Sequence, residues 1–363
     1  MHDSLPASSD EANGGEKSAV NFEFGPAFPC FTRRRLLASA ASGAAFAAIG
    51  PARARGNTEI RIQYDWLIGN GQIGDIVAQQ SGYFDAEKLT VTFGAGGPNA
   101  QTVPAVLSGQ ALGGQLSSST QALNAYGAGR PVKVFCFGYQ YAPYAYFSLP
   151  RSPIRTPQDL VGKTVAVNPN GHFMLDLILA LHKIDPARVR RVTMGADMTP
   201  LLAGQVDAVT GFTTNTAALA VLGPDRVTMT SEQAGVPTYA NAYFTFADDY
   251  QKNKDVLVRF IRAVAKGWAW AYQNRKAAVD MMCDAYPNLD RAIEHASVDV
   301  VMAIVFNEAT KQNGWGWFDN ARIERQIELF KQAGSFTTRI PDLDGFATHE
   351  ILDLTADARA KLG

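Results

Sequence analysis

The chain has 363 residues, of which 47% are hydrophobic and 18% charged, and its 33 basic and 34 acidic side chains leave a net charge of -1. An apolar fraction this high with balanced charge excludes a disordered chain, and it gives no general electrostatic reason to bind nucleic acid or an anionic membrane. Three cysteines are too few for a disulfide framework, and the length allows about two domains.

The first 54 residues predict an export leader. Residues 1–31 are polar and without periodicity, and residues 32–37 (TRRRLL) then introduce an apolar run, 36–49, that is too short to span a bilayer. The run ends at a small-x-small cleavage signal, Ala52-Arg53-Ala54. This order predicts a twin-arginine-type signal peptide cleaved near Ala54 and a mature chain in the periplasm. The alternative for the same residues is a surface helix with basic flanks.

Strands and helices alternate after the leader. Residues 58–64 (TEIRIQY) place apolar side chains on one face, as a half-buried strand does. Further strands are predicted at 89–93 and 132–137, with helices at 72–81, 101–108 and 120–126 and a Gly- and Ser-rich loop at 113–119. This alternation predicts right-handed βαβ units and a sheet covered by helices.

A second cycle begins near residue 144. Residues 144–149 are extended, and Pro150 and Pro153 prevent them from continuing as a central strand. Helices are then predicted at 156–160 and 173–182, strands at 164–167, 189–194, 206–211 and 239–246, and helices from 254 onward, including 290–312 and 321–333.

These elements predict an α/β chain with two lobes. Residues 55–148 would form the first part of lobe I, 149–240 lobe II, and 241–363 the return to lobe I with C-terminal helices. Two extended segments, near 144–149 and 239–246, would carry the chain between the lobes. Two such crossings make a hinge and leave a ligand cleft between the lobes.

Four stretches resemble a known family. They are residues 78–91 (AQQSGYFDAEKLTV), 107–110 (LSGQ) with 117–119 and 129–132, 156–167 (TPQDLVGKTVAV), and 202–208 (LAGQVDA). Together and in this order they resemble the solute-binding proteins of ABC importers, in the thiamine-pyrimidine-precursor branch related to the nitrate and sulfonate receptors. Lys88 and Leu112 stand where that family often has Gly and Asp.

The resemblance implies a type II periplasmic-binding-protein fold that takes a small-molecule ligand and hands it to a permease in the inner membrane. We further expect a monomer that works without a cofactor, and the balanced charge predicts no binding to nucleic acid. Closure of the two lobes on the ligand would be the mechanism, because a ligand that prefers the closed form shifts the equilibrium toward it.

Five loops are candidates for ligand contact, since ligands in open α/β sheets bind beyond the carboxyl ends of strands, against helix N-termini. The loops are 65–72, 117–119, 141–146, 168–172 and 213–215. The candidate ligand-binding residues in them are Asp65, Trp66, Asn70, Gln72, Ser118, Ser119, Tyr144, Asn170, Gly171, His172, Thr213 and Asn215. The resemblance implies that Trp66 stacks on a flat ring. Each residue also has a structural alternative, such as capping a helix or packing at the hinge.

Charge in these loops narrows the class of ligand. They contain no Arg or Lys, and Asp65 is their one acid. Receptors for anions usually add a cation to a helix N-terminus. We therefore expect a neutral or weakly cationic flat heterocycle, such as an aminopyrimidine. A sulfonate, a nitrate or an aromatic acid is the alternative.

An enzyme is the main alternative to a receptor. Enzymes that synthesise the pyrimidine part of thiamine share this fold, and they use a Cys-rich loop and an active-site histidine. Here Cys136 falls in a predicted strand and Cys283 in a predicted helix, and whether they pair is left open. No metal-binding, phosphate-loop or Ser/His catalytic pattern occurs in the sequence. We therefore expect a receptor rather than an enzyme, with no bound metal.

Overall fold

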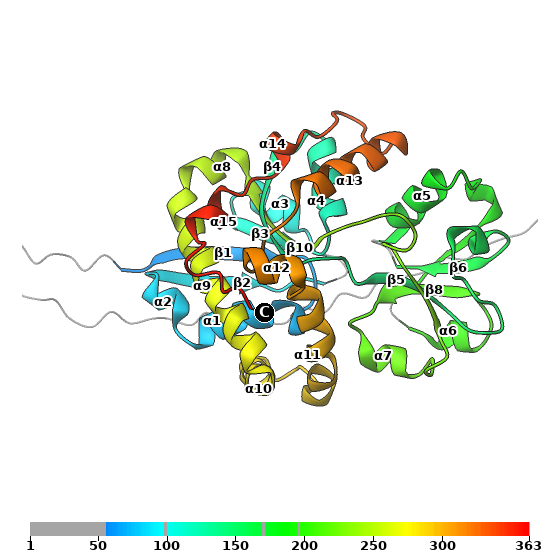
Figure 1. Ribbon diagram of the computed structural model, residues 1–363, viewed down its shortest axis with the longest axis horizontal. Helices are drawn as coiled ribbons and strands as arrows, with labels where there is room; N and C mark the ends of the chain where they lie inside the picture. The colour runs from blue at the N-terminus through cyan, green and yellow to red at the C-terminus, as the bar shows by residue number, and fades with distance from the viewer. Residues whose placement is uncertain (1–55, 98–99, 169–170, 195–196, 363) are drawn as a thin grey trace, which may run out of the picture. The chain divides into compact units, whose positions relative to one another are not determined.

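The computed structural model describes residues 56–97, 100–168, 171–194 and 197–362 (Figure 1). The predicted leader, residues 1–54, lies outside the described residues. None of the helices within these ranges is both long and apolar enough to cross a membrane. Cys136 and Cys283 are both buried and carry free thiols.

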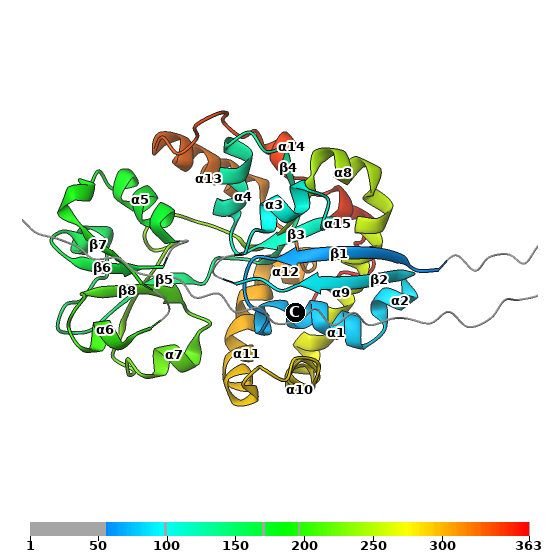
Figure 2. The ribbon, with the colours of Figure 1, turned by 180° about the vertical axis from the view of Figure 1, so that it is seen from behind.

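The first lobe is built on a sheet with the strand order β2-β1-β3-β10-β4. β1 pairs in parallel with β2 and β3, whereas β10 pairs antiparallel with β3 and β4. Figure 2 shows β1 lying between β2 and β3. The strands are β1 (Thr58–Tyr64), β2 (Leu89–Gly94), β3 (Gly113–Leu116), β4 (Val132–Tyr139) and β10 (Ala240–Phe246).

Helices from both ends of the described chain cover this sheet (Figure 1). They are α1 (Ile73–Gln80), α2 (Tyr83–Ala86), α3 (Thr102–Leu107), α4 (Ser119–Gly127), α8 (Ala247–Lys252), α9 (Lys254–Gln273), α10 (Arg275–Ala285), α11 (Arg291–Val305), α12 (Glu308–Asn313), α13 (Asn320–Gln332), α14 (Leu343–Phe346) and α15 (Glu350–Leu354).

The second lobe has its own sheet, with the order β7-β6-β8-β5-β9. β6 pairs in parallel with β7 and β8, and β5 pairs antiparallel with β8 and β9. Its elements are β5 (Tyr144–Ser148), β6 (Thr164–Val167), β7 (Arg190–Thr193), β8 (Ala208–Phe212), β9 (Val227–Thr230), α5 (His172–Leu181), α6 (Thr199–Leu202) and α7 (Thr216–Ala220). The two-lobe α/β fold predicted from the sequence is therefore confirmed.

The chain crosses between the sheets twice, at residues 140–143 and 231–239. The predicted crossing segments, near 144–149 and 239–246, are mostly the strands β5 and β10 that follow these crossings. β5 belongs to the second sheet because it pairs with β8 and β9 there. The first crossing therefore comes a few residues before the predicted boundary at 148.

Residues 113–116 form a strand, so the prediction of a loop over 113–119 is wrong for this part. All four residues of β3 are buried. A Cβ on Gly113 would lie 2.8 Å from the carbonyl oxygen of Phe244, and one on Gly114 would lie 2.7 Å from the Phe244 ring. Glycine is required here by close packing against β10, and this hides the strand pattern.

The predicted single helix at 290–312 is also wrong, because α11 ends at Val305 and α12 begins at Glu308. Asn307 caps the second helix: its side chain accepts from the Thr310 N–H at 3.2 Å, and the Thr310 hydroxyl accepts from the Asn307 N–H at 3.0 Å. This reciprocal capping satisfies N–H groups that a new helix leaves unpaired. Lys88, where the resembling family often has Gly, has a φ of 55° and so keeps the left-handed turn.

One buried carboxylate joins three elements of the first lobe. Asp75 on α1 accepts hydrogen bonds from the Tyr64 hydroxyl at 3.0 Å, the Tyr243 hydroxyl at 2.8 Å and the Trp268 indole N–H at 3.0 Å. The α1–α9 approach that brings Trp268 close depends on glycine, because a Cβ on Gly267 would lie 2.0 Å from the carbonyl oxygen of Gly74. No cation neutralises Asp75 among these contacts, so burial dominates and raises its pKa to about 6.

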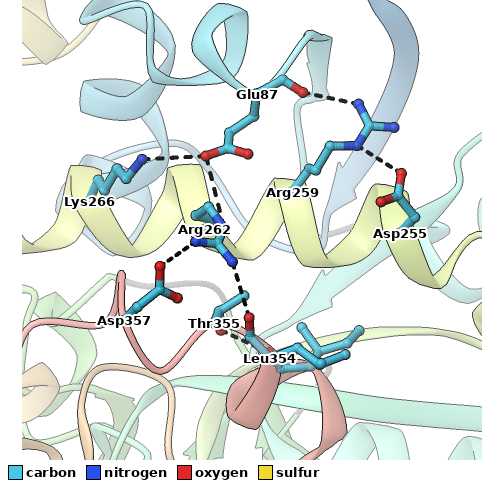
Figure 3. Close-up of polar contacts among 9 residues, drawn as sticks. Glu87, Asp255, Arg259, Arg262, Lys266, Leu354, Thr355 and Asp357 are labelled. Carbon is cyan, nitrogen blue, oxygen red and sulfur yellow. Dashed lines mark hydrogen bonds and ion pairs between the residues drawn. The ribbon is translucent and has the colours of Figure 1, made fainter.

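A second polar network holds the exposed side of α9 (Figure 3). Arg262 pairs with Asp357 at 2.5 Å and donates to the carbonyl oxygen of Leu354 at 3.1 Å, while Lys266 pairs with Glu87 at 3.3 Å. Exposed ion pairs contribute little to stability individually. Their effect here is to connect the turn after α2 and the segment after α15 to the same helix.

The pKa of Asp75 predicts how the Asp75→Asn variant responds to pH. A folded-state pKa raised above the unfolded value means that the native carboxyl destabilises the fold as pH rises from about 4 to 6. Asparagine does not titrate. The free energy of unfolding of Asp75→Asn, relative to that of the wild-type chain, should therefore increase across this window, by about 3 kcal/mol at most.

Urea unfolding at a series of pH values between 3.5 and 7.5 measures this difference. Asp248→Asn is the matched control, because Asp248 is exposed on α8. If the difference in the free energy of unfolding between Asp75→Asn and wild type does not change with pH, the raised pKa of Asp75 is contradicted.

Candidate ligand-binding site

A cavity lies between the loops that follow the strands of the two sheets. The empty space within and in front of it, open solvent at the mouth included, is about 700 Å³. We call it the aromatic compartment, because three rings, Trp66, Tyr144 and Phe212, meet in it. Its lining residues are Trp66, Ser117, Ser118, Thr120, Gln121, Asn124, Tyr144, Asn168, Phe173, Met174 and Phe212.

The rings come from both lobes. Trp66 follows β1 of the first sheet, and Phe212 ends β8 of the second. Their ring centroids are 5.9 Å apart with an interplanar angle of 52°. Phe212 also packs edge-on against Tyr144, at 5.8 Å. Because a ring contact of this kind spans the two lobes, it brings both of them to the same ligand position.

The serine loop before α4 is held by Asp65. One carboxylate oxygen of Asp65 accepts from the Ser117 hydroxyl at 2.6 Å, the Ser117 N–H at 3.3 Å and the Gln121 side chain at 3.0 Å. Ser118 caps the helix, and Gln121 completes the capping box by accepting from the Ser118 N–H at 3.2 Å. Asp65 therefore positions the residues that line the cavity, and it does not itself belong to the lining.

Tyr144 and Gly171 meet at the side of the cavity formed by the second lobe. A Cβ on Gly171 would lie 2.0 Å from the Tyr144 hydroxyl oxygen, so only glycine fits at this position. Burial raises the pKa of Tyr144, and its hydroxyl has no partner of hydrogen-bond geometry among the described residues. The ring is thus fixed in place with its hydroxyl unsatisfied.

Three buried polar atoms of this lining have no hydrogen-bond partner among the described residues. They are the side-chain oxygens of Asn124 and Asn168 and the hydroxyl of Tyr144. Buried polar atoms in folded proteins are nearly always paired, with protein, water or ligand. The described lining residues of the aromatic compartment include no charged side chain. The compartment therefore offers uncharged hydrogen-bonding groups between aromatic rings.

A second compartment adjoins the first and shares Trp66, Ser117 and Phe212 with it. Its empty space, again with open solvent at the mouth included, is about 1090 Å³. Its other lining residues are Leu67, Ile68, Gly69, Asn70, Gly71, Gln72, Tyr139, Pro143, Thr214, Asn215, Ala240, Asn241, Leu289, Ile293, Glu294, Ser297 and Val301.

Helix α11 fixes the loop at the floor of this compartment. The Asn70 side chain donates to the carbonyl oxygen of Glu294 at 2.7 Å and to the Ser297 hydroxyl at 2.8 Å, and the Asn70 N–H donates to the Glu294 carboxylate at 2.9 Å. Gln72 donates to the Gln115 side chain at 2.9 Å. Burial raises the pKa of Glu294, while the Asn70 N–H lowers it.

The structure distributes the predicted site residues over two roles. Those that line a compartment are Trp66, Asn70, Gln72, Ser118, Tyr144 and Asn215. The others lie outside the lining: Asp65 and Gly171 support it as described, His172 hydrogen-bonds Thr193 at 3.1 Å, and the Thr213 N–H donates to the carbonyl oxygen of Pro143 at 2.7 Å. Asn170 lies outside the described residues.

Ser119 contacts the second crossing segment instead of the cavity. Its hydroxyl accepts from the Tyr239 N–H at 3.1 Å and donates to Gln326 at 2.8 Å, and its own N–H donates to the carbonyl oxygen of Tyr239 at 2.9 Å. The predicted candidate Ser119 is therefore tied to the hinge.

Several lining residues were not among the predicted candidates. Thr120, Gln121 and Asn124 follow Ser117 at helical spacing, so the face of α4 carried a usable signal. Glu294 and Ser297 lie more than 220 residues from Asn70 in the sequence, and no local pattern connects them. Within the described residues, no cluster of His, Cys, Asp and Glu could hold a metal ion.

Comparison with known proteins identifies the family. A family model described as NMT1/THI5 like matches residues 70–278, more than half of the chain. The chain belongs to the NMT1/THI5-like family. This confirms the resemblance predicted from the four sequence stretches.

Relatives of this NMT1/THI5-like chain include a riboflavin-binding protein, RibY, from Chloroflexus aurantiacus. The two are 25% identical over 295 residues, covering 76% of this chain and 81% of RibY.

Solved structures with the same fold include two sulfonate-binding proteins. The alkanesulfonate-binding protein SsuA from Xanthomonas axonopodis pv. citri, bound to MOPS, is 15% identical with a TM-score of 0.59, and it covers 81% of this chain and 100% of its own. SsuA from Escherichia coli is 14% identical, also with a TM-score of 0.59, covering 82% and 100%. A desulfurization enzyme, DszB, is 14% identical with a TM-score of 0.54, covering 82% and 99%. The periplasmic-binding-protein fold is thus shared by receptors and by an enzyme.

The contact between Gly171 and Tyr144 predicts a double-mutant cycle. Gly171→Ala places a methyl group on the Tyr144 hydroxyl, which should lower the free energy of unfolding by about 1–3 kcal/mol. Tyr144→Phe removes that oxygen and should recover part of the loss in the double variant.

Urea unfolding of the two single variants and the double variant measures the coupling. Additive effects of the two changes would show that the contact does not constrain this wall of the cavity.

Proposed function

We propose that this chain is the periplasmic solute-binding receptor of an ABC importer and captures an uncharged, flat nitrogen heterocycle with a pyrimidine-type edge. The observation that carries this proposal is the aromatic compartment itself. It has rings from both lobes and unsatisfied amide and hydroxyl groups, and its described lining residues carry no charge. Delivery to a permease in the inner membrane follows from the role of such receptors.

The amide groups favour a heterocycle with a donor and an acceptor side by side. A carboxamide presents one acceptor and one donor in a plane, and it pairs with the edge of an aminopyrimidine-type ring in the way that Asn pairs with adenine. Asn124 and Asn168 supply two such groups, one from each lobe. A flat ring stacked on Trp66 would then be hydrogen-bonded at its edge by these amides.

Anions fit these groups less well. The unsatisfied oxygens of Asn124 and Asn168 are acceptors, and a sulfonate or a nitrate brings only further acceptors. The described lining of both compartments contains no lysine or arginine. A sulfonate receptor, the alternative that the solved structures suggest, would have to hold its anion with neutral donors such as hydroxyls and helix N-terminal N–H groups, without a cation in the described lining.

Within this class we favour a thiamine-precursor-like aminopyrimidine, with a flavin as the second candidate. The flavin ring carries the same kind of pyrimidine edge on a larger flat system. Two observations support the flavin as a candidate. They are the sequence similarity to RibY and the second compartment that adjoins the first.

A binding screen of the mature chain tests the proposal. Thermal shift against an aminopyrimidine, riboflavin, an alkanesulfonate and nitrate should give a rise in melting temperature only for the heterocycles, since a ligand that binds the native state stabilises it. Recovery of the bound compound unchanged would separate a receptor from an enzyme that acts on it. A shift with alkanesulfonate and none with either heterocycle would refute the proposed ligand class.

Trp66→Ala should weaken heterocycle binding about 5- to 150-fold, because ring stacking on an aromatic side chain contributes about 1–3 kcal/mol. Isothermal titration calorimetry measures this change. Trp317→Ala is the matched control, since Trp317 is a half-buried tryptophan that does not line either compartment. Equal affinity of the Trp66→Ala variant and the control would remove Trp66 from the site.

Lobe closure should be visible in solution. Trp66 and Phe212 pack across the cavity, and Phe173 on α5 packs against Phe330 on α13 at 5.4 Å, so both contacts join the lobes. Small-angle X-ray scattering of the mature chain should show a smaller radius of gyration with the heterocycle than without it. An unchanged radius with saturating ligand would contradict closure.

A further inference from the structure

The second compartment adjoins the aromatic compartment but differs from it in chemistry. Trp66, Ser117 and Phe212 line both, so the two compartments meet at these side chains. Beyond that boundary the lining includes Asn70, Gln72 and Glu294. One ligand could therefore place a flat part and a polar part in two different environments.

Two buried side chains point to a ligand with hydroxyl or other donor groups. Asn70 and Gln72 are each 4% exposed and line the second compartment. Their amide nitrogens donate within the protein, but neither side-chain oxygen has a partner among the described residues. These two oxygens are acceptors, and they require donors that the described protein does not supply.

Glu294 adds a third acceptor in the same compartment. Its carboxylate accepts from the Asn70 N–H at 2.9 Å, which leaves further lone pairs for a ligand donor. Its backbone is fixed as well, because its carbonyl oxygen accepts from the Asn70 side chain. Helix α11, which carries Glu294, packs against α7 of the second lobe, and both views show the two helices as neighbours (Figures 1 and 2).

We propose that the second compartment holds the hydroxyl-bearing side chain of a ligand whose flat ring occupies the aromatic compartment, and that Glu294 selects an uncharged side chain over a phosphorylated one. This rests on the proposed function. Hydroxyl groups can donate to the oxygens of Asn70, Gln72 and Glu294, whereas a phosphate would bring negative charge to a carboxylate with no lysine or arginine in the described lining.

Three flavins that differ only in the side chain test the proposal on the mature chain. Lumichrome has the ring without the side chain, riboflavin adds an uncharged polyol, and flavin mononucleotide adds a phosphate to that polyol. Calorimetry should find riboflavin bound at least about tenfold more tightly than lumichrome, and flavin mononucleotide at least about tenfold more weakly than riboflavin, since one hydrogen bond to a charged group is sufficient for a factor of this size.

Glu294→Gln tests the charge selection separately from the fold of the site. The variant keeps the shape of the side chain and one hydrogen-bond acceptor, so riboflavin should still bind. The ratio of the dissociation constants of flavin mononucleotide and riboflavin should fall at least about fivefold. Glu324→Gln is the matched control, because Glu324 is exposed on α13 and lines neither compartment. The control should keep the wild-type ratio.

The same comparison with an aminopyrimidine series covers the other ring of the proposed class: the 5-methyl compound, its 5-hydroxymethyl analogue and the phosphate ester of that analogue. Equal affinity for a ring with and without its hydroxyl group, or an unchanged discrimination against phosphate in Glu294→Gln, would overturn the inference while leaving the proposed function intact. If neither ring series binds, the proposed function fails and the inference fails with it.

Discussion

The hydrogen bonds to Asp75 are the constraint on which the first lobe depends. A carboxylate that is fully buried without a cation is unfavourable unless its oxygens are satisfied, and here Tyr64, Tyr243 and Trp268 satisfy them from β1, β10 and α9. Trp268 can reach Asp75 only if α1 lies close to α9, which the glycine contact allows. Since α1 follows directly on the loop that carries Asn70 and Gln72, the same arrangement sets the position of the cavity floor.

In the cavity, as in the core, a carboxylate holds neighbouring polar groups in place. The Asp65 carboxylate accepts hydrogen bonds from Ser117 and Gln121, so the one acid in the predicted loops orients neutral side chains. The carboxylate that does face a compartment, Glu294, comes from a helix in the C-terminal half. In the proposed function, stacking and amide pairing belong to one compartment and charge selection to the other, and the two compartments share Trp66, Ser117 and Phe212.

Much of the fold could be predicted from the sequence because strands such as β1 alternate buried and exposed side chains, and glycines end several helices. β3 escaped prediction because its glycines are packed against Phe244 and leave no alternation. The loops of the site were found from the rule that ligands lie beyond strand ends. The direction of individual side chains could not be predicted in this way. His172 hydrogen-bonds Thr193 on β7, and Glu294 lines the cavity only because α11 packs beside it in the folded chain.

The pairing of Ser119 with Tyr239 has a consequence for changing the ligand preference of this receptor. The serine loop, residues 117–119, and the second crossing segment share two hydrogen bonds between Ser119 and Tyr239. A substitution that removes the Ser119 hydroxyl therefore breaks its bond with the Tyr239 N–H, so it alters the second crossing segment together with the loop beside the compartment. Asn124 lies further along α4 and lines the same compartment, and its side-chain oxygen has no partner among the described residues, so a substitution there can change the lining separately from the crossing segment.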